Sequence, residues 1–108
     1  MVTLCIPTLN RYDLLDKALE TAMAGTVRPD RILVVDNGGY IDQVPNKHLI
    51  SEIHTPGMNI GVAASWNFFI RETKDIRIIS NDDVEFYPNT IETLVDSFDE
   101  NAVTYPAG

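Results

Sequence analysis

The chain has 108 residues, 44% of them hydrophobic, which is enough apolar material for one domain with a core of its own. Sixteen acidic residues against eight lysines and arginines give a formal net charge of -8, and this balance argues against a nucleic-acid partner, which requires clustered cations. A single cysteine permits no internal disulfide, and no apolar stretch approaches the roughly 20 residues of a membrane span. Because Met1 leads directly into a strand rather than into a signal segment, we expect a cytoplasmic protein.

Short β-branched runs alternate with longer amphipathic segments, the pattern of a parallel sheet covered by helices. The first strand is expected over residues 2–6 and is ended by Pro7, which lacks a backbone donor. Asn10 is then expected to cap a helix that Gly25 closes. The apolar side of this helix comprises Leu14, Leu15, Ala18, Leu19 and Ala22. The second expected strand, residues 31–35, is apolar almost throughout, which favours burial on both faces.

The middle of the chain is less regular. Residues 40–49 include Pro45 and favour a loop, and a brief strand is expected over 50–54. A second helix is expected from Val62 to about Thr73, because apolar residues recur there at helical spacing. These residues are Val62, Trp66, Phe69 and Ile70, and their spacing favours a core position for Trp66 over a sugar-stacking role.

Another strand is expected over residues 76–80, followed by a helix that Asn89 caps with Glu92 as its capping-box partner. The apolar stripe of that helix comprises Ile91, Leu94, Val95 and Phe98. Residues 102–105 again have β-like character.

Polar loops follow three of these strands, over residues 7–11, 36–39 and 81–83. The carboxyl ends of the strands share one edge in an open α/β sheet, so these loops are expected to converge on one crevice. Asp82 and Asp83 supply oxygen ligands that suit Mg²⁺ or Mn²⁺, cations that bridge to substrate phosphates. The alternative is a solvated turn, because Asn and Asp are ordinary turn formers.

Two common nucleotide-binding motifs are missing from the sequence. A Gly-x-Gly-x-x-Gly turn does not follow the first strand, and no phosphate-cradling Gly-Lys-Ser or Gly-Lys-Thr occurs. His48 and His54 have no cysteine or acid at metal-ligand spacing, which argues against a zinc site.

Four segments, in order, resemble the N-terminal, nucleotide-sugar-binding portion of a family 2 glycosyltransferase with the GT-A fold. They are residues 6–11, residues 34–38, residues 59–63 with Asn67, and residues 81–84 with Pro88. The resemblance implies a Rossmann-like fold with a mainly parallel sheet flanked by helices, and it spans nearly all of residues 1–108, taken as a single domain. It also implies that this domain is the donor-binding part of a longer enzyme.

The resemblance also implies roles for individual residues. Asp83 would coordinate the Mn²⁺ or Mg²⁺ that holds the donor diphosphate, and Asp82 would lie near the ribose or the water shell of the metal. Asp36 would accept a hydrogen bond from the base, unless it merely closes a turn with Gly38. The other residues implied at the nucleotide-sugar site are Pro7, Thr8, Asn10, Arg11, Asn37, Asn59, Gly61, Asn67 and Asn81. The alternative for Arg11 is a solvated side chain, and for Asn67 a side chain that faces solvent or bonds the neighbouring loop.

Two positions depart from the family pattern. Leu9 stands where an aromatic residue is frequent, which puts stacking of the base on that side chain in doubt. Asn81 replaces the first acid of the Asp-x-Asp motif, a variant that resembles a rhamnosyltransferase-like branch and leaves Asp83 as the main metal ligand.

The expected reaction is metal-dependent transfer of a sugar from a UDP- or dTDP-sugar to a hydroxyl of a glycan, lipid or protein acceptor, with inversion at the anomeric carbon. In the family the general base lies in the acceptor-binding half, so we expect it outside this chain. One alternative is a nucleotide-sugar-binding module without catalysis. A receiver-like or phosphatase-like domain is disfavoured because the first strand ends in Pro7 and Thr8 without an acid. An unpaired sheet edge would also allow a homo-oligomer.

Overall fold

A computed structural model describes residues 2–74 and 76–97 of the chain. Its centre is a four-stranded, all-parallel sheet in the order β3-β2-β1-β4. The strands are β1 (Val2–Thr8), β2 (Arg31–Asp36), β3 (Glu52–His54) and β4 (Ile76–Ile79). The helices are α1 (Tyr12–Met23), α2 (Gly61–Glu72) and α3 (Thr90–Asp96), with 3₁₀ turns η1 (Ile41–Gln43) and η2 (Lys47–Leu49). The expected Rossmann-like α/β fold with a parallel sheet flanked by helices is confirmed.

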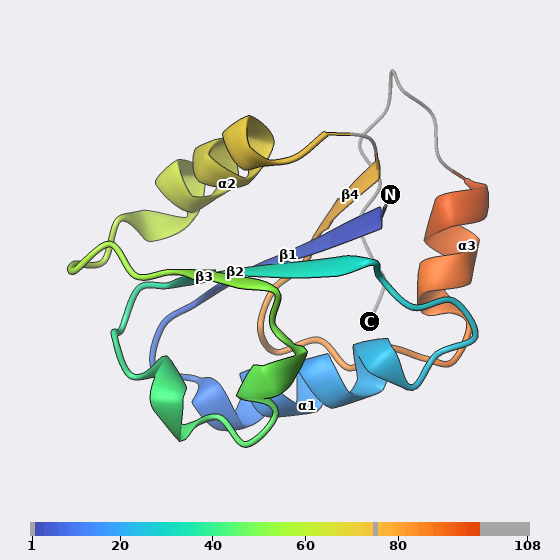
Figure 1. Cartoon of the computed structure of the whole chain (residues 1–108), viewed down its shortest axis with the longest axis horizontal. Coiled ribbons are helices and arrows are strands. Elements are labelled where there is room, and N and C mark those ends of the chain that lie inside the picture. The colour runs from blue at the N-terminus through green and yellow to red at the C-terminus, as the bar shows by residue number, and fades with distance from the viewer. Residues whose placement is uncertain (1, 75, 98–108) are drawn as a thin grey trace.

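Helices lie on both sides of the sheet. In Figure 1, α1 and the two 3₁₀ turns lie on one side and α2 on the other. The larger apolar cluster joins one face of the sheet to α1 and includes Leu4, Ile6, Leu15 and Leu19, all fully buried. A smaller cluster under α2 consists of Cys5, Leu33, Val35 and Phe69, with Trp66 packed against it. The two strands β1 and β2 are thus buried on both faces, which explains their continuous apolar runs.

Pro7 does not end the first strand, contrary to expectation. The strand continues to Thr8, and Pro7 pairs in register with Val35. The carbonyl of Cys5 accepts a bond from the amide of Ser80 and therefore faces β4. The carbonyl of Thr8 accepts a bond from the amide of Asn37, at the end of β2, and therefore faces β2. Because alternate residues face the same neighbour, the donor that Pro7 lacks would point toward β4, beyond the end of that strand. No ladder bond is therefore lost.

The helix boundaries differ from the expected caps. Asn10 is not the N-cap of α1: it adopts a left-handed backbone with φ of 56°, and Arg11 takes the cap position without a side-chain bond. Ala24 rather than Gly25 is the C-cap. Asn89 does precede α3 as expected, but its side chain makes no cap bond and Glu92 accepts a bond from the hydroxyl of Thr26 instead.

Some residues of the expected apolar stripes face solvent. Val62 and Ile70 of α2 are 59% and 51% exposed, whereas Ser65 and Phe69 face the sheet. Leu14 of α1 is also exposed. Phe98, the last residue of the expected apolar stripe, and the β-like segment 102–105 lie outside the described residues. In the part of the chain that the structure describes, no helix has both the length and the apolar character needed to cross a bilayer.

Candidate functional site

The carboxyl ends of all four strands lie along one edge of the sheet, because every strand runs in the same direction. In Figure 1 helices α1 and α2 both begin at this edge. Thr8 ends β1 and Asp36 ends β2, so the polar loops that follow them are neighbours although they are far apart in sequence. The loop after β4 joins them through Asp82, whose carboxylate contacts Thr8. The expected convergence of the three loops is therefore observed.

Asp82 is the buried member of the acidic pair formed by Asp82 and Asp83, with only 1% of its side chain exposed. The hydroxyl of Thr8 donates a 2.9 Å hydrogen bond to Oδ2 of Asp82. The other oxygen, Oδ1, lies 3.0 Å from a guanidinium nitrogen of Arg11, yet it accepts no well-aligned hydrogen bond. Burial raises the pKa of Asp82 above its ordinary value, while the Thr8 bond and the Arg11 charge oppose that shift.

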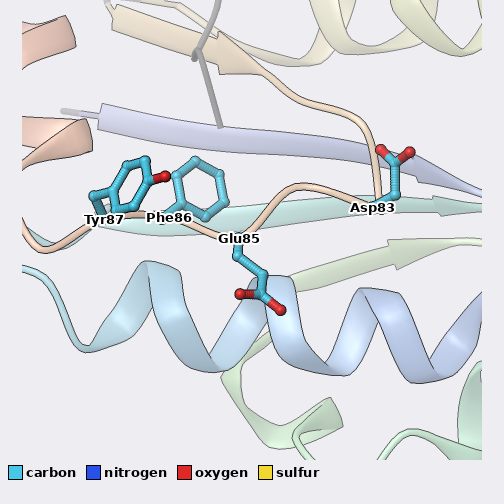
Figure 2. Close-up of a pocket in the computed structure, with 4 residues that line it drawn as sticks. All are labelled: Asp83, Glu85, Phe86 and Tyr87. Atoms are coloured by element: carbon cyan, nitrogen blue, oxygen red, sulfur yellow. The ribbon is translucent and has the colours of Figure 1, made fainter.

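Asp83 is the exposed acid, with 47% of its side chain accessible. Its Oδ2 lies 3.5 Å from the second terminal nitrogen of Arg11, so one guanidinium faces both carboxylates. Asp83 also borders a hollow of about 310 Å³ that Glu85, Phe86 and Tyr87 complete. Figure 2 shows the carboxylates of Asp83 and Glu85 pointing in different directions from the same loop, with the rings of Phe86 and Tyr87 at the other end of that loop. Of the two acids Asp82 and Asp83, Asp83 is therefore the one that lines the hollow.

The buried carboxylate of Asp36 is surrounded by protein donors. Tyr12 donates a 2.7 Å bond from its hydroxyl to Oδ1, and the amides of Gly38 and Gly39 donate to the same oxygen. The amide of Ile41 donates to Oδ2 at 3.0 Å. Asp36 thus closes the turn with Gly38, and its Oδ2 accepts one bond.

Asn37 connects the end of β2 to the start of α2. Its side chain donates to the hydroxyl of Ser65 at 3.3 Å and accepts a 3.1 Å bond from the amide of Ile60. Asn59 accepts a 2.9 Å bond from the amide of Gly61, which has a positive φ of 81° that favours glycine. These bonds fix the loop before α2 against the strand edge.

The structure places the remaining residues that the sequence indicated on β1, in the loops and on α2. Pro7 is half-buried within β1, and Asn10 lies in the loop after it. Asn81 and Asn67 are exposed, Asn67 on α2. Leu9 follows Thr8 and is 40% exposed, and its aliphatic side chain provides no aromatic surface for a base to stack on.

The acidic pair meets part of the requirement for a divalent cation. Within residues 2–74 and 76–97 no group of three or more His, Cys, Asp or Glu side chains is arranged to hold a metal. Mg²⁺ is nevertheless commonly bound by one or two carboxylates, with water and substrate phosphates completing the shell. The unbonded Oδ1 of Asp82 and the exposed carboxylate of Asp83 fit that mode of binding.

Two residues of the site were missed in the sequence. Tyr12 begins α1 with its ring buried against Asp36, and Ser65 lies on the buried side of α2 against Asn37. The sequence offered a weak signal for Ser65, since a polar residue lies within an otherwise apolar helix face. Tyr12 gave none, because a tyrosine at the start of a helix is usually assigned to the core.

A parallel sheet with polar loops gathered at the carboxyl edge of its strands defines a ligand-binding α/β domain. The sequence profile of Glycosyl transferase family 2 matches residues 3–107, and the chain therefore belongs to this family. The family is one of glycosyltransferases, which use a nucleotide-sugar donor and an acceptor. No curated protein matches the chain at a significant level.

Proposed function

We propose that the carboxyl edge of the sheet binds the nucleotide diphosphate of a UDP- or dTDP-sugar, and that the chain is the donor-binding part of a metal-dependent, inverting transferase. The observation that carries the proposal is the acidic pair, Asp82 and Asp83, held beside Thr8 and Arg11 where the strand ends meet. A diphosphate with its cation suits such a position because the metal screens the acids from the phosphates.

Each residue has a proposed part in this binding. Asp83 holds the Mg²⁺ or Mn²⁺ directly, and Asp82 contacts the ribose or the hydrated metal. Asp36 reads the base through Oδ2, and Asn37 holds the neighbouring loop. The remaining contacts are proposed for Pro7, Thr8, Asn10, Arg11, Asn59, Gly61, Asn67 and Asn81.

The bound metal would stabilise the charge that develops on the departing diphosphate. The protein itself positions the donor so that an acceptor hydroxyl can approach the anomeric carbon from the opposite side. Direct displacement inverts that carbon and requires a general base for the acceptor proton. By the family resemblance, we place this base in the acceptor-binding portion of the enzyme, outside this chain.

The proposal is tested by calorimetric titration of UDP, dTDP and GDP into the chain with and without Mn²⁺. We expect a pyrimidine diphosphate to bind with Mn²⁺ and the affinity to fall at least about tenfold in Asp83→Ala. Glu20→Ala is the matched control, because it removes the same charge from an exposed position on α1. Metal-dependent binding that survives Asp83→Ala, or that Glu20→Ala weakens equally, would contradict the proposal.

A further inference from the structure

Arg11 lies between the two acids that would hold the metal. One terminal nitrogen of its guanidinium is 3.0 Å from Asp82 Oδ1, and the other is 3.5 Å from Asp83 Oδ2. The planar guanidinium presents its donors in a fork, which allows a single side chain to face two carboxylates. The pair therefore already has a positive partner supplied by the chain itself.

The local structure offers no other reason for a cation at this position. Arg11 is the N-cap of α1 but makes no side-chain cap bond, and a positive charge at a helix N-terminus opposes the helix dipole. The preceding residue, Asn10, adopts the left-handed backbone that turns the chain into the helix. A Cβ at Gly38 would lie 2.7 Å from Oδ1 of Asn10, so close packing against Gly38 fixes this turn. The carboxylates explain the placement of Arg11.

Arg11 and a metal would compete for the same atoms. Oδ2 of Asp82 is engaged by the hydroxyl of Thr8, which leaves Oδ1 as the free ligand atom of that buried carboxylate. Oδ1 is the atom that Arg11 faces. A divalent cation held by Asp83, with Asp82 contacting it or its water shell, would therefore lie within a few ångströms of the guanidinium, where two like charges repel strongly.

We propose that Arg11 is the resident counter-cation of the Asp82 and Asp83 pair, and that it must withdraw before a divalent cation binds there and then pairs with the donor diphosphate. The inference rests on the proposed function and deepens it. Arg11 is 53% exposed and has a long, flexible stem, so it can leave the acids without unpacking the core. A diphosphate offers a bidentate partner of the kind that arginine prefers. Metal and diphosphate would consequently assist each other's binding, since each favours the withdrawn position of Arg11.

The test uses Arg11→Met with two separate probes, Mn²⁺ alone and UDP or dTDP without metal. Lys17→Met is the matched control, because it removes a charge from an exposed position on the same helix, about 9 Å along its axis. In Arg11→Met we expect Mn²⁺ to bind at least about tenfold more tightly than in the unmodified chain, and the metal-free diphosphate to bind at least about tenfold more weakly. Lys17→Met should change either affinity by less than about twofold, because solvent and salt screen a charge at that distance.

The two affinities are expected to change in opposite directions, which separates this role from a merely structural one, since a damaged site would bind both Mn²⁺ and the diphosphate more weakly. The inference is overturned if Arg11→Met binds Mn²⁺ no more tightly than the unmodified chain, or if its metal-free affinity for the diphosphate is unchanged. If metal-dependent binding of the diphosphate still requires Asp83 in that case, the proposed function stands without the inference. If neither the unmodified chain nor Arg11→Met binds either probe, and UDP and dTDP also fail to bind in the presence of Mn²⁺, both fall together.

Discussion

The hydroxyl of Tyr12 donates a 2.7 Å hydrogen bond to Oδ1 of Asp36, and so joins the first turn of α1 to the last residue of β2. The same hydroxyl accepts a 3.1 Å bond from the amide of Tyr40. Because the Asp36 carboxylate also receives three backbone amides, this contact shapes the whole loop between β2 and η1. The loop that is proposed to hold the base is therefore held in place by donors of the chain itself.

Tyr12→Phe should destabilise the fold and weaken nucleotide binding together. The substitution removes a buried hydrogen bond to a carboxylate and leaves the Tyr40 amide without its acceptor, so we expect a loss of about 1–2 kcal/mol in the free energy of unfolding. Urea denaturation measures this loss. Tyr40→Phe is the control, because the Tyr40 side chain is exposed and only its backbone joins the network. Equal stability of the two variants would contradict a structural role for the Tyr12 hydroxyl.

The stability of the chain should also fall in alkali because of Tyr12. Burial, with the hydrogen bond to Asp36, raises the pKa of the phenol above its ordinary value of 10.0. The folded state then binds the proton more tightly than the unfolded state. The stabilisation is fully present below pH 10 and is lost as the pH rises through the folded pKa. Unfolding measured from pH 8 to pH 11 should show a steeper loss of stability in the unmodified chain than in Tyr12→Phe, and parallel curves would contradict the assignment.

Gly38→Ala should disrupt the site by packing alone. A Cβ at Gly38 would overlap the Tyr12 hydroxyl and lie 2.7 Å from Oδ1 of Asn10, so one of these side chains must move. We expect a loss of about 2–3 kcal/mol in the free energy of unfolding and weaker nucleotide binding. Gly57→Ala is the comparison, because Gly57 has a positive φ of 83° and open space around it. It should cost about 1 kcal/mol from the backbone and leave binding unchanged.

The arrangement of the sheet was predictable because it depends on local patterns. Continuous apolar runs located the strands β1, β2 and β4 to within a few residues, and the alternation with amphipathic segments indicated parallel pairing. Parallel pairing alone places the carboxyl ends of the strands on one edge, so the convergence of the three polar loops was predicted without knowledge of any side-chain position.

The details of the site were not predictable because they depend on contacts between distant residues. Asn10 suits a helix cap locally, but close packing against Gly38 places it in a left-handed turn and passes the cap to Arg11. The Pro7 backbone remains in the strand only because its missing donor would point beyond the end of β4. Each outcome requires the position of a partner more than 20 residues away, which no local pattern contains.

Arg77→Met should destabilise α2 although Arg77 lies on β4. The guanidinium caps the C-terminus of the helix: Nε donates to Oγ1 of Thr73 at 2.7 Å, and a terminal nitrogen donates to the Thr73 carbonyl at 2.9 Å. Losing charged donors from Thr73, the C-cap residue of α2, and from the carbonyl of Ile70 in its last turn should lower the free energy of unfolding by about 1–2 kcal/mol. Arg71→Met, an exposed change in the last turn of the same helix, should cost less than about 0.5 kcal/mol. Thermal or urea unfolding compares the two, and equal losses would mean that charge, rather than capping, is responsible.

Asp82→Asn should separate stability from binding. Burial raises the pKa of Asp82, which means that ionisation of this carboxyl is less favourable in the folded chain than in the unfolded one. Its folded pKa is raised, so the unmodified chain loses stability as the pH rises from the ordinary value of 3.8 through the folded value. The amide keeps an oxygen for the Thr8 hydroxyl and carries no buried charge, so the variant should match the unmodified chain near pH 3.5 and exceed it in free energy of unfolding at pH 7.

Binding of Mn²⁺ with the diphosphate should fall at least about tenfold in the same variant, because a carboxylate oxygen is lost from the pair. A variant that is less stable than the unmodified chain at pH 7 would show instead that the ion pair with Arg11 outweighs the cost of burying the charge.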